Sequence, residues 1–271
     1  MSAKTGGKLL DDVRRIMRLK HYSIHTERIY CDWVKQYIKF HKMTDKQALL
    51  ISPETKVESF LSYLAVHRKV AVSTQNQAMN ALVYLYKHVL NHPLEKTIDA
   101  VRSTKNKKIP VVLTQSEVKD IIVLLEGVSQ LVVKIMYGSG LRITEAVRLR
   151  VQDVDFDYKQ ITVRSGKGNK DRVTPLSSSL FPPIKTHLQR VNLIHDKDLS
   201  DGYGAVYLPY ALNKKYPNAE KEWGWQYIFP ARSLALDPRS NVVRRHHLDQ
   251  SSVNKAIKVA VKKLNINKRV S

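Results

Sequence analysis

Arg142 is the residue whose setting most suggests chemistry. It follows the turn Gly138-Ser-Gly140 and precedes Glu145 by three positions. An arginine held by a nearby carboxylate beside a glycine turn can act as an oriented clamp for an oxyanion or a phosphate. The same spacing is also that of an ordinary surface ion pair on a helix, and these residues alone favour that second interpretation.

A second group of cations lies in the stretch SGKGNKDR, which begins at residue 165. Its two glycines allow tight backbone geometry, and Lys167, Lys170 and Arg172 place three positive charges in one turn. A flexible solvated turn would have the same composition. A nucleotide-binding loop is excluded, because the spacing G-x-x-x-x-G-K-[ST] and the helix that must follow it are both missing.

The overall charge indicates the class of partner. The 271 residues include 46 Lys and Arg against 24 Asp and Glu, a formal net charge of +22. An excess of this size favours a polyanion, most simply nucleic acid. The single cysteine, Cys31, excludes an internal disulfide framework and a multi-cysteine zinc site. Because the sequence has neither a membrane-length apolar stretch nor a signal peptide, we expect a cytoplasmic protein that binds no membrane.

Four amphipathic helices are predicted in residues 1–100. Apolar residues recur there at helical spacing, and short polar turns separate the four runs. The runs are Leu9, Val13, Ile16 and Met17; Ile29, Trp33, Tyr37 and Phe40; Val57, Phe60, Leu61 and Leu64; and Ala78, Ala81, Leu82, Leu85 and Val89. We therefore expect a small helical bundle.

A basic connector follows at residues 101–112. It begins VRSTKNKKIP, which contains no acidic residue and includes Lys105, Lys107 and Lys108. Such a segment is either a solvated linker or a positive strap that lies along DNA phosphates.

The second domain is predicted at residues 113–271. Thr114 and Glu117 form a capping box ahead of its first helix. Apolar residues alternate between 151 and 175, which predicts a β-hairpin turned by SGKGNKDR. The pattern is less regular from 176 to 250, and an amphipathic helix then runs from Ser251 to Leu264. The expected fold is mainly α with a small antiparallel sheet.

Two of these motifs, in this order, resemble those of the tyrosine recombinase (phage integrase) family. GLRITEAVRLRVQDVDF is similar to its first arginine box, and GKGNKDRVTPL to its catalytic β-hairpin. YSIHTERIYCDWVKQYIKFH and STQNQAMNALVYLYKHVL are similar to its core-binding domain. The resemblance implies a four-helix, SAM-like core-binding domain at 1–100 and an α+β catalytic domain at 113–271. These would form a C-shaped clamp around duplex DNA.

A narrower resemblance concerns an insertion at about residues 203–250. ALNKKYPNAEKEWGWQYIFPA and LDPRSNVVRRHHLDQSSVNKAI resemble the insertion that is particular to integron integrases. Those enzymes act on folded single-stranded cassette ends, whose identity lies in bases flipped out of the helix. Flat side chains that could stack on such a base are Trp223, Trp225, Pro238, His246 and His247.

Other roles remain open for these residues. The two tryptophans could be core residues, although the family match favours stacking for Trp225 and His247. A zinc site is discounted, because adjacent histidines are poor co-ligands and no carboxylate or cysteine stands at ligand spacing. Arg244 and Arg245 could hold the phosphates next to the flipped base.

The resemblance also implies a mechanism that needs no metal or cofactor. In this family a tyrosine hydroxyl attacks a DNA phosphate, forms a 3′-phosphotyrosine and frees a 5′-hydroxyl. By resemblance, Arg142 clamps the non-bridging oxygens and Lys167 gives a proton to the departing 5′-oxygen. Lys170, Arg172 and the lysines of the connector would contact DNA, and the full-length form would assemble as a synaptic tetramer near the nucleoid.

The family places a second box, H-x-x-R, and the nucleophilic tyrosine after a helix that here ends near Leu264. We find neither between Leu264 and Ser271. We therefore expect a truncated integron recombinase that binds DNA without cutting it. The alternative is a non-catalytic DNA-binding protein that occupies recombination sites.

Overall fold

The protein is described by a computed structural model that covers residues 3–104, 111–164, 166, 170–209 and 212–268. Four residues with predicted roles, Lys105, Lys107, Lys108 and Lys167, lie outside these ranges. The chain divides into two compact units, Met1–Ile109 and Pro110–Ser271.

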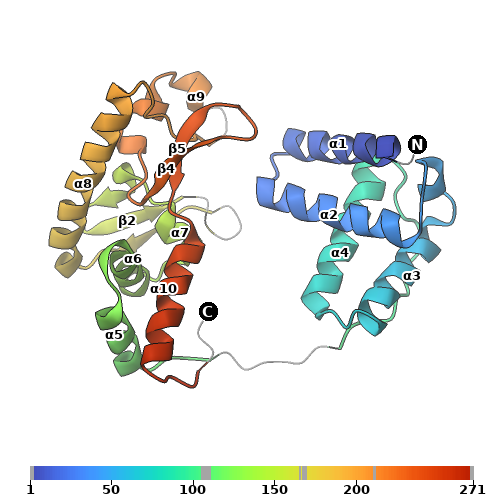
Figure 1. Cartoon of the computed structure of the whole chain (residues 1–271), viewed down its shortest axis with the longest axis horizontal. Coiled ribbons are helices and arrows are strands. Elements are labelled where there is room, and N and C mark those ends of the chain that lie inside the picture. The colour runs from blue at the N-terminus through green and yellow to red at the C-terminus, as the bar shows by residue number, and fades with distance from the viewer. Residues whose placement is uncertain (1–2, 105–110, 165, 167–169, 210–211, 269–271) are drawn as a thin grey trace. The chain divides into compact units, whose positions relative to one another are not determined.

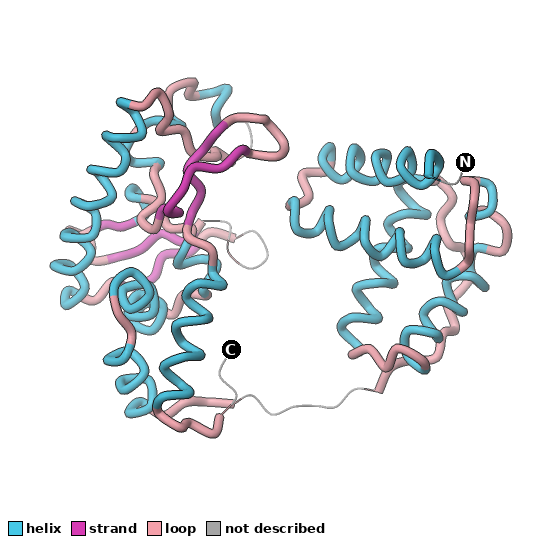
Figure 2. Tube along the Cα trace, in the orientation of Figure 1, coloured by secondary structure: helices cyan, strands magenta, loops and turns pink. Residues whose placement is uncertain are grey.

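The first unit is helical throughout its regular structure (Figures 1 and 2). Its α-helices are α1 (Ala3–Leu19), α2 (Ile24–Phe40), α3 (Pro53–Val66) and α4 (Val72–Tyr84), and a π-helical turn continues α4 over Leu85–Val89. Ser23 caps α2 by accepting the backbone N–H of Thr26, and Pro53 occupies the first turn of α3, where no N–H is needed. The predicted apolar faces meet in one core, which includes Tyr37, Phe60 and Leu82.

The second unit combines helices with two small antiparallel sheets (Figure 2). The helices are α5 (Gln115–Leu124), α6 (Gly127–Ser139), α7 (Ile143–Val147), α8 (Phe181–Ser200), α9 (Leu212–Lys215) and α10 (Gln250–Lys263). The strands are β1 (Val154–Asp155), β2 (Gln160–Val163), β3 (Arg172–Pro175), β4 (Pro230–Leu236) and β5 (Val243–His247). The expected mainly α fold with a small antiparallel sheet is confirmed.

The first sheet has the strand order β1-β2-β3. Its central strand pairs Ile161 with Val154 on one side, and Val163 with Arg172 on the other. Ile161 and Val163 are buried in the core of the unit, which also takes in residues of α6 and α10. This packing holds the β2–β3 hairpin against the helices, and α10 packs on α5, α6 and α7.

The region between 176 and 250 is more regular than its sequence indicates. It contains the 20-residue helix α8 and the β4–β5 hairpin. The pattern of α8 was missed because its buried residues are Ile184, Val191, His195 and Asp198, so half of the buried face is polar. The hairpin pairs Pro230 with His247 at its open end and Leu236 with Val243 next to its turn.

Candidate active site and nucleic-acid interface

Arg142 lies at the junction of α6 and α7. Gly140 ends α6 in the left-handed conformation, with φ of 64°, and α7 begins at Ile143. The Arg142 backbone N–H donates to Oε2 of Glu145 at 2.8 Å, and its Nη1 donates to Oε1 at 3.0 Å. The side chain is still 56% exposed. One edge of the guanidinium is therefore held by the protein, and much of the group is open to a ligand.

Glu145 organises a second arginine as well. Nη1 and Nη2 of Arg172, at the start of β3, donate to its two carboxylate oxygens at 3.0 and 2.7 Å. The Glu145 side chain is 8% exposed, and the hydrogen bonds from Arg172 lower its pKa to about 2. Glu145 is therefore a permanent anion that orients two cations, and it is unsuited to accept a proton.

The geometry revises the expected role of Arg172. We expected this residue to contact DNA, but its guanidinium forms a bidentate pair with Glu145. Such a pair uses the planar fork of arginine and ties the β2–β3 hairpin to α7.

Gly166 permits this close approach of the hairpin. Its N–H donates to the carbonyl of Lys170 at 3.0 Å, which closes the hairpin above β2 and β3. A Cβ at this position would lie 2.9 Å from Nη1 of Arg172 and 3.1 Å from that carbonyl. Lys170 is exposed. Lys167 follows Gly166 in the sequence and lies outside the described residues.

Arg150 is a functional candidate that the sequence analysis missed. Its side chain is buried and donates to the backbone carbonyls of Trp225 and Tyr207, at 2.5 and 2.6 Å. The guanidinium carbon lies 4.7 Å from the centroid of the Tyr227 ring and 5.5 Å from that of Trp225. Arg150 therefore connects the segment after α7 to the aromatic residues of the predicted insertion.

Three rings of this region form an aromatic cluster, which consists of Tyr227, His246 and His247. Tyr227 stacks on His246 with ring centroids 5.9 Å apart and meets His247 edge-on at 5.4 Å. The two histidine rings are 4.5 Å apart. Trp225 is half-buried and joins this cluster through Arg150, so it is neither a full core residue nor a freely exposed one.

The two histidines of the aromatic cluster are neutral at pH 7. Nδ1 of His247 lies 2.8 Å from the carbonyl of Leu248, which can only accept, so this nitrogen carries the proton. Burial lowers the pKa of His247 to about 4. Burial and then the positive charge of Arg148 lower the pKa of His246. Neutral imidazoles are suited to stacking and carry no charge toward a phosphate.

Pro238 is separated from the aromatic cluster. It is exposed in the turn that joins β4 to β5, whereas His246 and His247 lie at the open end of the same hairpin. The structure thus brings Trp225 and the two histidines into one region and leaves Pro238 at the opposite end of the hairpin.

Arg244 and Arg245 are corrected as phosphate contacts. Arg244 is 11% exposed and pairs with Glu220 and Asp237, both at 3.1 Å. Arg245 is 13% exposed and forms a bidentate pair with Asp198. Their guanidinium groups are already occupied by carboxylates within the fold, so they do not present free charge to a nucleic acid.

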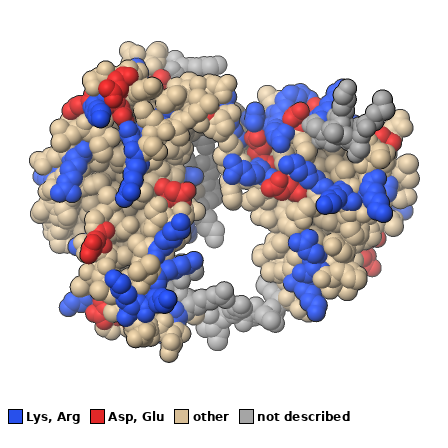
Figure 3. Space-filling view, in the orientation of Figure 1, with Lys and Arg blue, Asp and Glu red and all other residues tan. Residues whose placement is uncertain are grey.

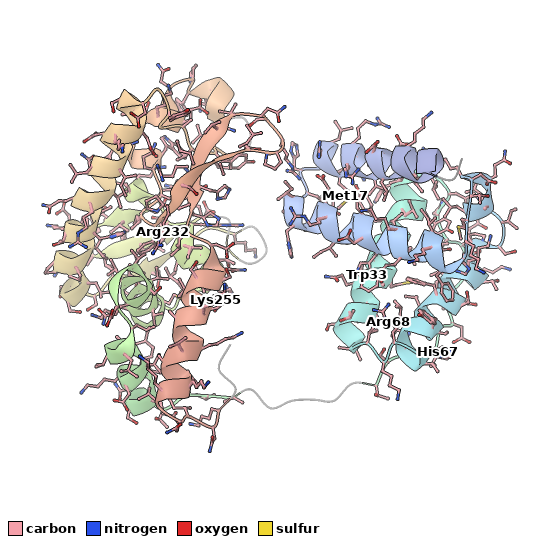
Figure 4. All side chains as sticks on the ribbon, viewed as in Figure 1. Met17, Trp33, His67, Arg68, Arg232 and Lys255 are labelled. Atoms are coloured by element: carbon pink, nitrogen blue, oxygen red, sulfur yellow. The ribbon has the colours of Figure 1, made fainter. Side chains whose placement is uncertain are left out.

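Free positive charge lies elsewhere, on the solvent face of α10. Lys255, Lys258 and Lys262 are exposed there, while Val253 and Ala260 face the core. Figure 3 shows Lys and Arg side chains gathered over this helix, and Figure 4 labels Lys255 on it. The sequence analysis used only the apolar face of α10. The lysine spacing on the other face was the signal that would have identified this basic surface.

The pattern H-x-x-R does occur earlier in the chain, at His25–Arg28 and His187–Arg190. The first lies in α2 and the second in α8. His187 is held inside the fold, where Nε2 lies 2.8 Å from the carbonyl of Ile228 and burial lowers its pKa. Neither pattern follows α10, the position that the family's second box occupies.

Two kinds of site are absent from the described part of the chain. No group of three His, Cys, Asp or Glu residues there could hold a metal ion. Among the helices of the same residues, none is both long enough and apolar enough to cross a membrane.

Comparison with known proteins gives concordant matches for both units. A family model described as "Phage integrase family" matches residues 111–271, and one described as "Phage integrase, N-terminal SAM-like domain" matches residues 9–96. The chain is 42% identical over 261 residues to proteins described as "Integrase/recombinase" in Escherichia coli and Pseudomonas aeruginosa. Each of these alignments covers 96% of this chain and 77% of the relative.

Solved structures share the fold. A lambda integrase tetramer bound to a Holliday junction matches with a TM-score of 0.56 and 13% identity, over 100% of this chain and 67% of that one. XerH recombinase bound to a palindromic difH substrate matches with a TM-score of 0.53 and 15% identity, over 93% and 66%. Together with the family models, these matches confirm the expected pairing of a SAM-like domain with a recombinase catalytic domain.

Proposed function

This chain belongs to the phage integrase family, and we propose that it is an integron-type site-specific recombinase that acts on folded single-stranded cassette ends. The observation that carries this proposal is the half-buried surface formed by Trp225 and the aromatic cluster. A flipped base needs a flat partner, and a base stacked on an aromatic side chain gains roughly 1–3 kcal/mol. Arg150 links this surface to the segment that follows Arg142, so recognition and chemistry share one framework.

The chemistry that we propose for this site is phosphoryl transfer stabilised by fixed cations. Arg142 would bind the non-bridging oxygens of the scissile phosphate through the exposed part of its guanidinium. Glu145 would hold that group in place and, being ionised, would take no proton. We assign Lys167 the transfer of a proton to the departing 5′-oxygen, on the strength of its place in the hairpin sequence alone.

We further propose that phosphate contacts supply most of the affinity for DNA. The net charge of +22, Lys170, the exposed lysines of α10, and Lys105, Lys107 and Lys108 of the connector support this assignment. Structural neighbours crystallised on a Holliday junction and on difH DNA support DNA as the partner, and the lambda integrase tetramer supports a tetrameric assembly. Pro238, at the hairpin turn, is proposed as a further contact.

A binding comparison tests the proposal. The two probes are a synthetic DNA hairpin with one extrahelical nucleotide and a fully paired hairpin with the same stem. The wild-type protein should prefer the first, and Trp225→Ala should reduce that preference by about five-fold or more, since one base stack is lost. Tyr158→Ala, which removes an exposed aromatic side chain in the β1–β2 turn, is the control and should preserve the preference. Equal affinity of the wild-type protein for both probes would contradict the proposal.

A further inference from the structure

The donors of Arg245 are almost all used inside the protein. Nε and Nη2 donate to the two carboxylate oxygens of Asp198, at 2.5 and 2.7 Å, and Nη1 donates to the carbonyls of Ala231 and Arg232 at 2.8 and 2.9 Å. A guanidinium has five N–H donors, so at most one remains for another partner. Asp198 is 7% exposed, so the pair is shielded from water.

These contacts join three segments that are distant in the sequence. Asp198 lies in the last turn of α8, Ala231 and Arg232 lie in β4, and Arg245 lies in β5. Its backbone N–H also donates to the carbonyl of Ala205 at 3.2 Å. His246 and His247 are the next two residues of β5. The place of their rings therefore depends on where Arg245 holds the strand.

We propose that Arg245, through its pair with Asp198, is a positioning residue that holds His246 and His247 ready for an extruded base without touching DNA itself. This inference rests on the proposed function of the aromatic cluster. A surface that is held in its bound arrangement before binding loses less conformational freedom when the ligand arrives. Lysine cannot replace arginine in this role, because a single ammonium cannot make the two parallel bonds to Asp198.

Two variants distinguish this role from a phosphate contact. Asp198→Asn removes a buried negative charge and one side of the bidentate pair. If Arg245 bound a phosphate, this change would free its charge and leave DNA affinity unchanged or higher. If Arg245 positions the histidines, the preference for the extrahelical hairpin over the fully paired hairpin should fall about five-fold or more.

Arg245→Lys gives the complementary result. It keeps the positive charge, so a phosphate contact would be preserved, whereas a positioning role predicts the same loss of preference as Asp198→Asn. The slope of log affinity against log salt should equal that of the wild-type protein in both variants, because losing one phosphate contact would flatten it by roughly 0.9. Asp196→Asn makes the same change of charge at an exposed position of α8 and should behave as the wild type.

The controls separate this inference from the proposed function. If the wild-type protein prefers the extrahelical hairpin and Trp225→Ala loses that preference, the proposed function stands. In that case, an unchanged preference in Asp198→Asn and Arg245→Lys overturns only the positioning role. Loss of cooperative thermal unfolding in both variants also overturns it, since the pair would then support the whole domain and not the histidines in particular.

Discussion

At the scale of single residues, the site is organised by carboxylates that orient arginines. Glu145 is bonded to both Arg142 and Arg172, yet only Arg142 remains more than half exposed. Two arginines that look equivalent in the sequence therefore have different duties. Arg142 is available to a phosphate, and Arg172 holds the hairpin beside it.

The ionisation of His247 gives a prediction about acid stability. Its pKa is about 4 in the folded protein and about 6.5 in an unfolded chain, so the unfolded chain binds the proton more tightly. The contribution of the neutral imidazole to stability is therefore present above about pH 6.5 and is lost as the pH falls toward 4. His247→Gln has no such titration. We expect the difference in melting temperature between wild type and variant to shift in favour of the variant between pH 7.5 and pH 5, in thermal unfolding. A difference that stays constant over this range would contradict the assignment.

At the scale of elements, the β2–β3 hairpin is held in place by the close approach of Gly166 to Arg172. Gly166→Ala should displace the Arg172 guanidinium, because the new Cβ would lie within 2.9 Å of Nη1. We expect the variant to lose on the order of 1–3 kcal/mol of stability, the usual range for steric overpacking.

Gly138→Ala is the matched control for this change. Its Cβ would meet only Leu180 Cδ1 at an ordinary 3.6 Å, and alanine favours the helix in which Gly138 lies. Chemical denaturation of the two variants gives the comparison. If Gly166→Ala were as stable as Gly138→Ala, the Arg172–Glu145 pair would not depend on the glycine.

Elements also show how far the sequence could predict this site. The Arg142–Glu145 pair was predictable because its members are three residues apart, and the hairpin because its strands alternate. The contacts of Arg150 with Trp225 and of Arg245 with Asp198 span 75 and 47 residues. Charged residues in such contacts have the sequence pattern of a solvated surface, so Arg244 and Arg245 were taken for phosphate ligands. The helix α8 was missed for the same reason, since His195 and Asp198 lie on its buried face.

At the scale of the whole molecule, charge dominates the expected behaviour. An excess of 46 basic over 24 acidic residues, with basic connector, hairpin and α10 surfaces, is consistent with on the order of 6–10 neutralised phosphates. The slope of log affinity against log salt should then be about −5 to −9 between 50 and 200 mM salt. Fluorescence anisotropy with a labelled duplex measures it, and a slope near zero would contradict nucleic-acid binding.

The central claim is that the surface formed by Trp225 and the aromatic cluster holds an extruded base. Fluorescence of 2-aminopurine at the extrahelical position of the DNA hairpin reports this directly, because stacking on an aromatic ring quenches its emission. The wild-type protein should quench the probe on binding, and Trp225→Ala, at concentrations that saturate the DNA, should quench it much less. Emission that is unchanged on binding, or quenched equally by wild type and Trp225→Ala, would contradict the account.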